Sequence, residues 1–287
     1  MTKTCALFVL GVCANCHGVD VLVLASGNGN FDPQLIAALE GAGHVVTLGP
    51  PFHELDADDV IGGCDVVYLQ ANYNWAFGDM PVEGQQKLLD FLALGGGVVT
   101  CEWLMWKVGD PMQLQVLEPE LPSTSDGTYA ETLMTTYTQV TPDAVLNEGV
   151  REKFTFANQN IGGSETYLTP KAGATVFYAS DQVGIGVVGW DVGAGRVISF
   201  SSVAGALSVQ NEDFARLLAN AMTWAAGEGE EICIADCNDD LQLNILDFVC
   251  FQGLFQSGDD AADINGDGAL NILDFVAFQG AFVEGCI

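Results

Sequence analysis

The C-terminal part of the chain contains one segment twice, and this duplication limits what that part can fold into. Residues 243–255 read LNILDFVCFQGLF and residues 270–282 read LNILDFVAFQGAF, so the offset is 27 residues and 2 of 13 positions differ. Each copy follows an acidic, Asn-rich loop, at 236–244 and at 263–271. Two such units in tandem predict a small module in which each loop leads into its own helix.

Both loops have the spacing of a calcium-binding loop. Ca²⁺ takes about six to eight oxygen ligands, which a loop of about 12 residues supplies from positions 1, 3, 5, 7, 9 and 12. The expected ligands are Asp236, Asn238, Asp240, the carbonyl of Gln242, Asn244 and Asp247 in the first loop, and Asp263, Asn265, Asp267, the carbonyl of Ala269, Asn271 and Asp274 in the second. Position 6 is Gly268 in the second loop but Leu241 in the first. This difference predicts a weaker first site, because a left-handed turn costs a non-glycine residue about 1–2 kcal/mol. The alternative is an Asx-rich turn before each helix that holds no metal.

Phenylalanine recurs at i, i+3 and i+7 in both copies, so the two helices can bury these faces against each other. The residues are Phe248, Phe251, Phe255, Phe275, Phe278 and Phe282. A core this small needs support from metal ions or disulfides. We expect two disulfides in the module, with the pairing left open. The cysteines concerned are Cys233, Cys237, Cys250 and Cys286.

The loops and the NILDF helix starts resemble a type I dockerin, in the variant that ends in Gly-Cys, here Gly285 and Cys286. The resemblance covers about 233–287 and implies two bound Ca²⁺ ions and docking to a cohesin-like or cell-surface protein. The family reads its partner with positions 10 and 11 of each loop, which are Ile245, Leu246, Ile272 and Leu273 in this chain. These apolar residues depart from the Ser or Thr often found there.

Acidic side chains run through the whole chain. Its 287 residues include 38 Asp and Glu against 8 Lys and Arg, which gives a formal net charge of −30. Residues 230–287 contain 12 acidic and no basic residues, and the rest of the chain carries −18. This charge makes nucleic acid and anionic membrane surfaces poor partners. Beyond the N-terminus, no apolar segment is long enough to span a membrane.

The N-terminus resembles a secretory signal peptide. One basic residue precedes the apolar run 5–14 and small residues follow it, so we expect a signal over 1–18, cleavage after Ala14 or Gly18, and export to the medium or the cell surface. Cleavage after Gly18 removes 3 of the 9 cysteines and leaves an even number for an oxidising compartment. Residues 13–17 also match the CxxCH pattern of haem attachment. Because this pattern falls inside the expected signal, haem is the disfavoured alternative.

Residues 19–226 alternate strands with helices and form the larger domain, which a linker at 227–232 joins to the module at 233–287. We expect strands at 19–26, 44–48, 64–70, 98–101, 175–179, 184–190 and 196–201, and helices at 32–42, 82–94 and 211–226. Strands that are apolar on both faces predict a parallel sheet covered by helices on both sides. The fold class is therefore α/β, a flavodoxin-like parallel sheet with a C-terminal hairpin, plus a small all-α module. We expect 104–170 to be an irregular insertion.

This layout resembles the class I glutamine amidotransferase-like superfamily, in its ThuA-like or DUF4350-like branch. The matching segments are VLVLASGN at 21–28, LLDFLALGGGVV at 88–99, AVLNEGVREKF at 144–154, GAGRVISFSS at 193–202 and FARLLANAMTWAA at 214–226. Amidotransferases pair a Cys after the fourth strand with a later His, but no histidine follows Cys101 here. The resemblance therefore implies a fold that lacks the catalytic Cys-His set. We expect Cys64 and Cys101 to remain largely buried thiols, too far apart for a disulfide.

Ligands of open parallel sheets bind outside the carboxyl ends of the strands. The amides, carboxylate and aromatic ring expected there suit a neutral sugar or polyol, and the candidates are Asn28, Gln70, Asn72, Glu102 and Trp103. The alternative is that the aromatic rings pack beneath the insertion and the polar groups cap helices. We expect a secreted, dockerin-anchored protein for binding or assembly on carbohydrate. The alternative function is a carbohydrate-active enzyme of polysaccharide catabolism that uses Glu102.

Overall fold

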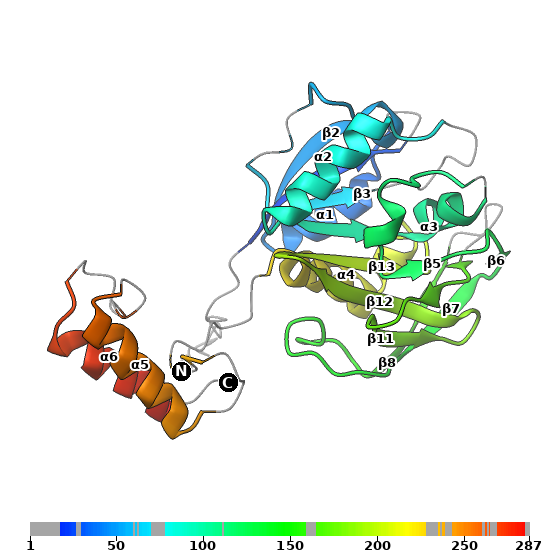
Figure 1. The fold of residues 1–287 in the computed structure, drawn as a ribbon. Coiled ribbons are helices and arrows are strands. Elements are labelled where there is room, and N and C mark those ends of the chain that lie inside the picture. Colours follow the sequence, from blue (N-terminus) through cyan, green and yellow to red (C-terminus); the bar gives the residue numbers. More distant parts are fainter. Residues whose placement is uncertain are drawn as a thin grey trace, which may run out of the picture. The chain divides into compact units, whose positions relative to one another are not determined.

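The structure is a computed structural model, and it describes residues 18–26, 30–59, 61, 63–69, 78–110, 112–158, 165–227, 235, 237–238, 243–259, 262, 264 and 269–284, with Glu102 and Glu284 described by their backbone only. The chain divides into two compact units, Met1–Gly229 and Glu230–Ile287. Both are drawn in Figure 1.

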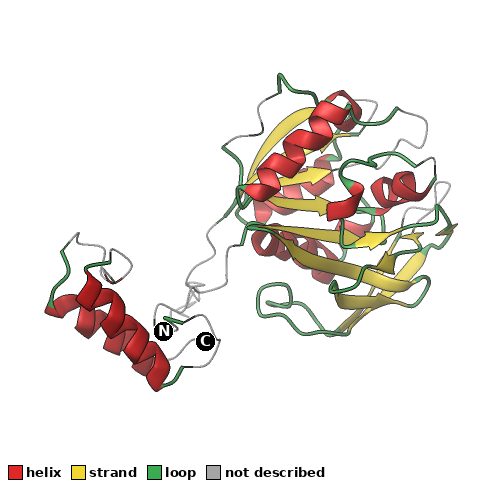
Figure 2. Ribbon diagram, viewed as in Figure 1, coloured by secondary structure: helices red, strands yellow, loops and turns green. Residues whose placement is uncertain are grey.

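A nine-stranded mixed sheet forms the centre of the larger unit, in the order β2-β1-β3-β4-β13-β12-β11-β7-β8 (Figures 1 and 2). The parallel part consists of β2 (Val45–Pro51), β1 (Asp20–Ala25), β3 (Val66–Leu69), β4 (Gly97–Thr100) and β13 (Gly195–Phe200). The antiparallel part consists of β12 (Gly184–Val192), β11 (Thr175–Ser180), β7 (Met134–Gln139) and β8 (Lys153–Ala157).

Helices cover both faces of the parallel part, as the apolar runs predict. α1 (Pro33–Gly41) and α4 (Glu212–Ala225) lie on one face, and α2 (Val82–Ala93) and α3 (Glu102–Gly109) lie on the other (Figure 1). Alternate residues of each strand enter the two cores, and burying one such side chain contributes about 1.5–3 kcal/mol. The hairpin between β12 and β13 is also confirmed.

The segment 104–170 is more regular than expected. β7 and β8 add two antiparallel strands to the main sheet, and α3 begins at the end of β4. Two short ladders pair β5 (Ser123–Thr124) with β10 (Thr169–Pro170) and β6 (Tyr129–Ala130) with β9 (Glu165–Thr166). The described part of this unit also contains the 3₁₀ turns η1 (Phe52–Glu54), η2 (Glu118–Glu120) and η3 (Ser208–Gln210).

The two outer strands of the sheet differ in chemistry from the inner ones. β2 ends in Pro50 and Pro51, which have no backbone N–H to donate to a further strand. β8, at the opposite edge, begins at the exposed Lys153. Proline and lysine are common on edge strands because both oppose the addition of another strand.

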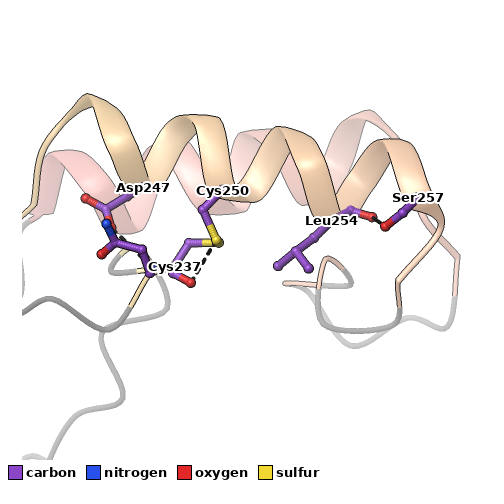
Figure 3. The surroundings of a disulfide bond; sticks show 6 residues. Cys237, Asp247, Cys250, Leu254 and Ser257 are labelled. Atoms are coloured by element: carbon purple, nitrogen blue, oxygen red, sulfur yellow. Dashed lines mark hydrogen bonds between the residues drawn. A yellow bond between two sulfur atoms is a disulfide. The ribbon is translucent and has the colours of Figure 1, made fainter.

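The smaller unit is built on α5 (Ile245–Ser257) and α6 (Ile272–Glu284). The predicted aromatic stripes meet, because Phe251 and Phe278 are buried and their rings stack with centroids 4.4 Å apart and planes 8° apart. Cys237 and Cys250 form a disulfide with a Cα–Cα distance of 5.7 Å, and it attaches the segment before α5 to the middle of that helix (Figure 3). A disulfide within the module is thus confirmed, while Cys233 and Cys286 lie outside the described residues. Across the described part of the chain, no helix is long and apolar enough to cross a membrane.

Candidate functional site

Five strands end at one edge of the parallel sheet, and this carboxyl edge is where the sequence places a ligand. Of the predicted ligand-binding residues, Asn28, Gln70 and Asn72 lie outside the described residues. Glu102 is the first residue of α3, and its side chain also lies outside the description. Their role at the edge therefore stays a prediction.

Trp103 is the predicted ligand-binding residue whose side chain is described. It is 6% exposed, and its ring contacts Trp106 edge-on at 5.6 Å and Tyr129 at 6.4 Å between centroids. Trp106 lies one turn further along α3 and Tyr129 lies on β6, and both belong to the segment 104–170, so the Trp103 ring packs beneath the insertion. Tyr129 is 42% exposed and is the most exposed ring of this cluster, while Trp106 is partly buried.

Cys101 occupies the position at which an amidotransferase holds its nucleophile, but its surroundings are those of a core residue. The thiol is buried and points at the Leu69 carbonyl, 3.8 Å away, and the hydroxyl of Tyr68 lies beside it. The backbone of Cys101 is extended, with φ −135°. Cys64 is half-buried, and burial raises the pKa of its thiol to about 11. Neither cysteine forms a disulfide, as expected.

His44 lies at the opposite, amino edge of the sheet. Its Nδ1 accepts a hydrogen bond from Val19 N–H at 3.3 Å, and its Nε2 lies 3.1 Å from the Ala219 carbonyl. Burial lowers the pKa of His44, which favours the neutral ring that these two contacts require. Within the described ranges, no histidine contacts Cys101, so the residues described show no catalytic pair.

A buried carboxyl group that the sequence did not single out lies behind the carboxyl edge. Glu165, on β9, is fully buried, and three hydroxyl groups donate hydrogen bonds to it. The donors are Thr135 Oγ1 at 2.9 Å, Ser180 Oγ at 3.0 Å and Ser201 Oγ at 2.8 Å. Burial raises the pKa of Glu165 to about 7, although the hydroxyl donors act in the opposite direction.

The hydrogen-bonded cluster continues on both sides of Glu165. The hydroxyl of Tyr137 lies 3.0 Å from Ser201 Oγ and 2.7 Å from Ser202 Oγ. On the other side, Asn158 Nδ2 donates to Thr135 Oγ1 at 2.9 Å, while Asn158 Oδ1 is buried without a partner. The cluster joins β7, β9, β11 and the end of β13, so it fixes how the insertion meets the sheet.

The two predicted calcium loops are described only in part. Asp236, Asp240, Gln242, Asp263, Asn265 and Asp267 lie outside the described residues. Asn238, Asn244, Asp247, Ala269, Asn271 and Asp274 are described. Among the described residues, no group of three or more acidic, His or Cys side chains is close enough together to hold a metal ion. A calcium site therefore remains a prediction from the loop spacing.

The described loop residues make the same contacts in both copies. Asp247 and Asp274 are buried, and their Oδ2 atoms accept the N–H groups of Asn244 at 2.8 Å and Asn271 at 2.7 Å. These contacts cap both helices, and in the first copy they form a capping box. Oxygen donors of this kind suit Ca²⁺, and the segment 230–287 has no basic residue to neutralise its 12 carboxylates. The residues present thus fit calcium, and the helix caps that the structure shows are compatible with either interpretation of the loops.

Both helices of the smaller unit expose the same apolar residues. On α5, Ile245 is 70%, Leu246 55% and Val249 59% exposed, and on α6, Ile272 is 69%, Leu273 55% and Val276 58% exposed. We call these two sets the repeated apolar face. A hollow lies beside it, lined by Val249, Gln252, Gly253 and Gln256 of α5 with the rings of Phe255 and Phe275.

The repeated apolar face lies in the most acidic part of the chain, yet it carries no charge. Twelve acidic residues fall within 230–287, and in α5 and α6 they are only the buried Asp247 and Asp274 and the terminal Glu284. Exposed apolar residues in a set that lacks charge are typical of a protein-binding surface.

No family model and no curated protein matches the chain. Solved structures match its larger unit. A cytoplasmic protein from Salmonella typhimurium LT2 has a TM-score of 0.53 and 13% identity, and the match covers 72% of this chain and 99% of that one. A protein described as ThuA-like from Parabacteroides merdae has a TM-score of 0.51 and 15% identity, with 74% and 91% coverage. A glutamine amidotransferase from Thermotoga maritima has a TM-score of 0.50 and 10% identity, with 73% and 99% coverage.

At these identities the likeness establishes the fold alone. The larger unit has the α/β fold of class I glutamine amidotransferase-like proteins. ThuA-like proteins share this fold, and the match covers about 72% of the chain. The smaller unit is a helical pair with one described disulfide.

Proposed function

We propose that this chain is an exported docking protein. Its smaller unit acts as a dockerin: it binds two Ca²⁺ ions and attaches the chain to a cohesin-like or cell-surface protein. Its larger unit is a ThuA-like domain that serves binding or assembly, with a carbohydrate as its ligand class.

The observation that carries this proposal is the repeated apolar face. Ile245 and Leu246 at the start of α5 reappear as Ile272 and Leu273 at the start of α6, and all four are more than half exposed. Leaving apolar residues in water costs stability, at about 25 cal/mol per Å² of surface that could be buried. A partner that covers these residues at the equivalent positions of both copies removes their apolar surface from water, and this burial contributes favourably to the free energy of binding.

Three further features support the rest of the proposal. The Cys237–Cys250 disulfide is typical of an oxidising compartment and agrees with export. In the larger unit, Cys101 is buried away from His44, which favours binding over glutamine hydrolysis. Tyr129 offers an exposed ring at the carboxyl edge, and aromatic rings suit the apolar face of a sugar.

Binding of the full-length protein to purified type I cohesins, measured by calorimetry in Ca²⁺ and in chelator, tests the docking. The double substitution Leu246→Asp with Leu273→Asp should weaken binding by at least about 100-fold, because central apolar contacts are often worth about 2 kcal/mol each. Val283→Asp is the matched control, because Val283 is 83% exposed on α6 but its equivalent in α5 is Gln256. An equal loss of affinity in the double variant and in Val283→Asp would contradict the proposal. So would an affinity that is the same in Ca²⁺ and in chelator.

A further inference from the structure

We propose that the carboxyl group of Glu165 is a proton-dependent latch that holds the β6–β9 ladder against the carboxyl edge of the sheet. In its neutral form the latch is closed, and ionisation of Glu165 opens it. This inference concerns the larger unit and is independent of the proposed docking.

The first argument is where Glu165 lies. Three hydroxyl groups from three separate elements reach its two oxygens: Thr135 from β7, Ser180 from the end of β11 and Ser201 from the end of β13. The backbone is joined at the same place, because Thr166 N–H donates to the Ser201 carbonyl at 2.9 Å and Glu165 forms a bridge with Ser202. One carboxyl group therefore connects β9 to the rest of the sheet.

The second argument is the charge around Glu165. A buried carboxylate is costly unless a cation or several hydrogen bonds compensate for it. Among the described side chains that contact Glu165, none is basic. The titratable groups that act on it are Tyr137 on β7 and Asp181 after β11, and the charge of Asp181 raises the pKa of Glu165 further.

Two other titratable side chains described on the elements around β9, Lys107 and Tyr129, have contacts of their own. Lys107 of α3 donates to Gln113 Oε1 at 3.2 Å and lies over the ring of Phe52. Tyr129 of β6 contacts Trp103. The described surroundings of Glu165 therefore favour its neutral form.

Besides the buried Glu165, the latch holds exposed residues of the β6–β9 ladder in place. Ala130 pairs with Glu165 and Tyr129 with Thr166, and Tyr167 N–H donates to the Thr128 carbonyl at 3.1 Å. Tyr129 and Tyr167 are both 42% exposed, so the ladder presents two tyrosines to solvent at this edge. When the latch opens, these two rings lose their fixed positions.

The direction of the pH effect follows from the pKa. Burial raises the pKa of Glu165 from 4.5 to about 7, so the closed state binds more protons than the open state between these values. The stabilisation of the closed state by the Glu165 proton is therefore fully present below about pH 4.5 and is lost as the pH rises through 7. Linkage then makes the open population about 70-fold larger at pH 8.5 than at pH 5.

Amide hydrogen exchange of Thr166 in the full chain tests the latch, since its N–H donates to the Ser201 carbonyl, a hydrogen bond between the ladder and the sheet that opening breaks. After correction for intrinsic exchange rates, this amide should exchange about 70-fold faster at pH 8.5 than at pH 5. Glu165→Gln keeps the shape of the side chain but cannot ionise, so its exchange should not change with pH. Glu131→Gln removes an exposed charge next to β6 and should behave like the unchanged protein. Global stability is a poorer readout, because the buried His44 lowers stability as the pH falls below its ordinary pKa.

An identical pH response in all three proteins would overturn the latch. If Glu165→Gln fails to fold, a carbon-13 titration of the Glu165 carboxyl group in the unchanged protein decides the question. A carboxyl pKa near 7 supports the latch, and one at the ordinary glutamate value overturns it.

Discussion

Replacing Phe278 by alanine should unfold the smaller unit and leave the larger one folded. Phe278 is fully buried, and its ring stacks on Phe251 at 4.4 Å. Removing a buried phenylalanine costs about 3–5 kcal/mol, including about 0.5–1.5 kcal/mol for the aromatic pair. A single core in a unit of this size supplies only about 3–5 kcal/mol, so the loss matches the whole of its stability.

Two spectroscopic signals separate the units. All 5 tryptophans lie outside 230–287, so tryptophan emission reports on the larger unit alone. Far-UV circular dichroism reports on both units, and α5 and α6, with 13 residues each, contain more than a third of the described α-helical residues. Phe278→Ala should therefore lose helical signal at 25 °C while its tryptophan unfolding transition stays where it was.

The control is Val283→Ala. Val283 is 83% exposed on the same helix, and exposed substitutions usually change stability by less than about 0.5 kcal/mol. A Phe278→Ala protein with unchanged helical signal would refute the argument that stacked phenylalanines hold the unit together. So would a shift in the tryptophan transition, because it would show that the two units do not fold separately.

Two further predictions concern the proposed sites. Asp263→Ala should weaken Ca²⁺ binding more than Asp236→Ala, and Leu241→Gly should strengthen it, because the expected turn at position 6 costs leucine about 1–2 kcal/mol and costs glycine nothing. Calorimetry on the full chain measures all three, and equal effects of the two Asp substitutions would contradict this. If the larger unit hydrolyses glycosides, Glu102→Gln should abolish turnover and leave sugar binding intact in a reducing-sugar assay. If it only binds sugar, no turnover appears, and Trp103→Ala weakens affinity by about 1–3 kcal/mol, because the exposed ring of Tyr129 loses the buried ring that it packs on.

The parallel part of the fold was predictable because its strands are uninterrupted apolar runs. Val21 to Ala25, Val66 to Leu69 and Val98 to Val99 are apolar without interruption, and such runs fit only strands covered on both faces. The helices α1, α2 and α4 were predicted to within about two residues of their bounds for a related reason, because their apolar periodicity is clear.

The parts that were missed lack such patterns. β7 reads MTTYTQ, and its Thr-rich alternation is a weak signal until β8 is placed beside it. α3 reads EWLMWKVG, has no side-chain cap and is apolar on most sides, so nothing in the sequence marks where it begins.

The Glu165 cluster could not be predicted from the sequence for a different reason. Glu165 sits in a strand of two residues, and its hydrogen-bond donors come from Thr135, Ser180 and Ser201, far apart in the chain. A single buried carboxyl group has no local signature, because its burial is created by elements distant in sequence. The calcium loops are the opposite case, since all their expected ligands lie within 12 consecutive positions.

The edges of the sheet bear on how this protein behaves when many copies are crowded together, as docking to a shared surface would require. Exposed strand edges are the usual starting points for fibrils, because one copy's edge can extend another's sheet. Pro50 and Pro51 close the outer edge of β2, and the charge of Lys153 marks the start of β8. If docking holds copies side by side at high local concentration, these residues oppose strand addition at the positions that they occupy.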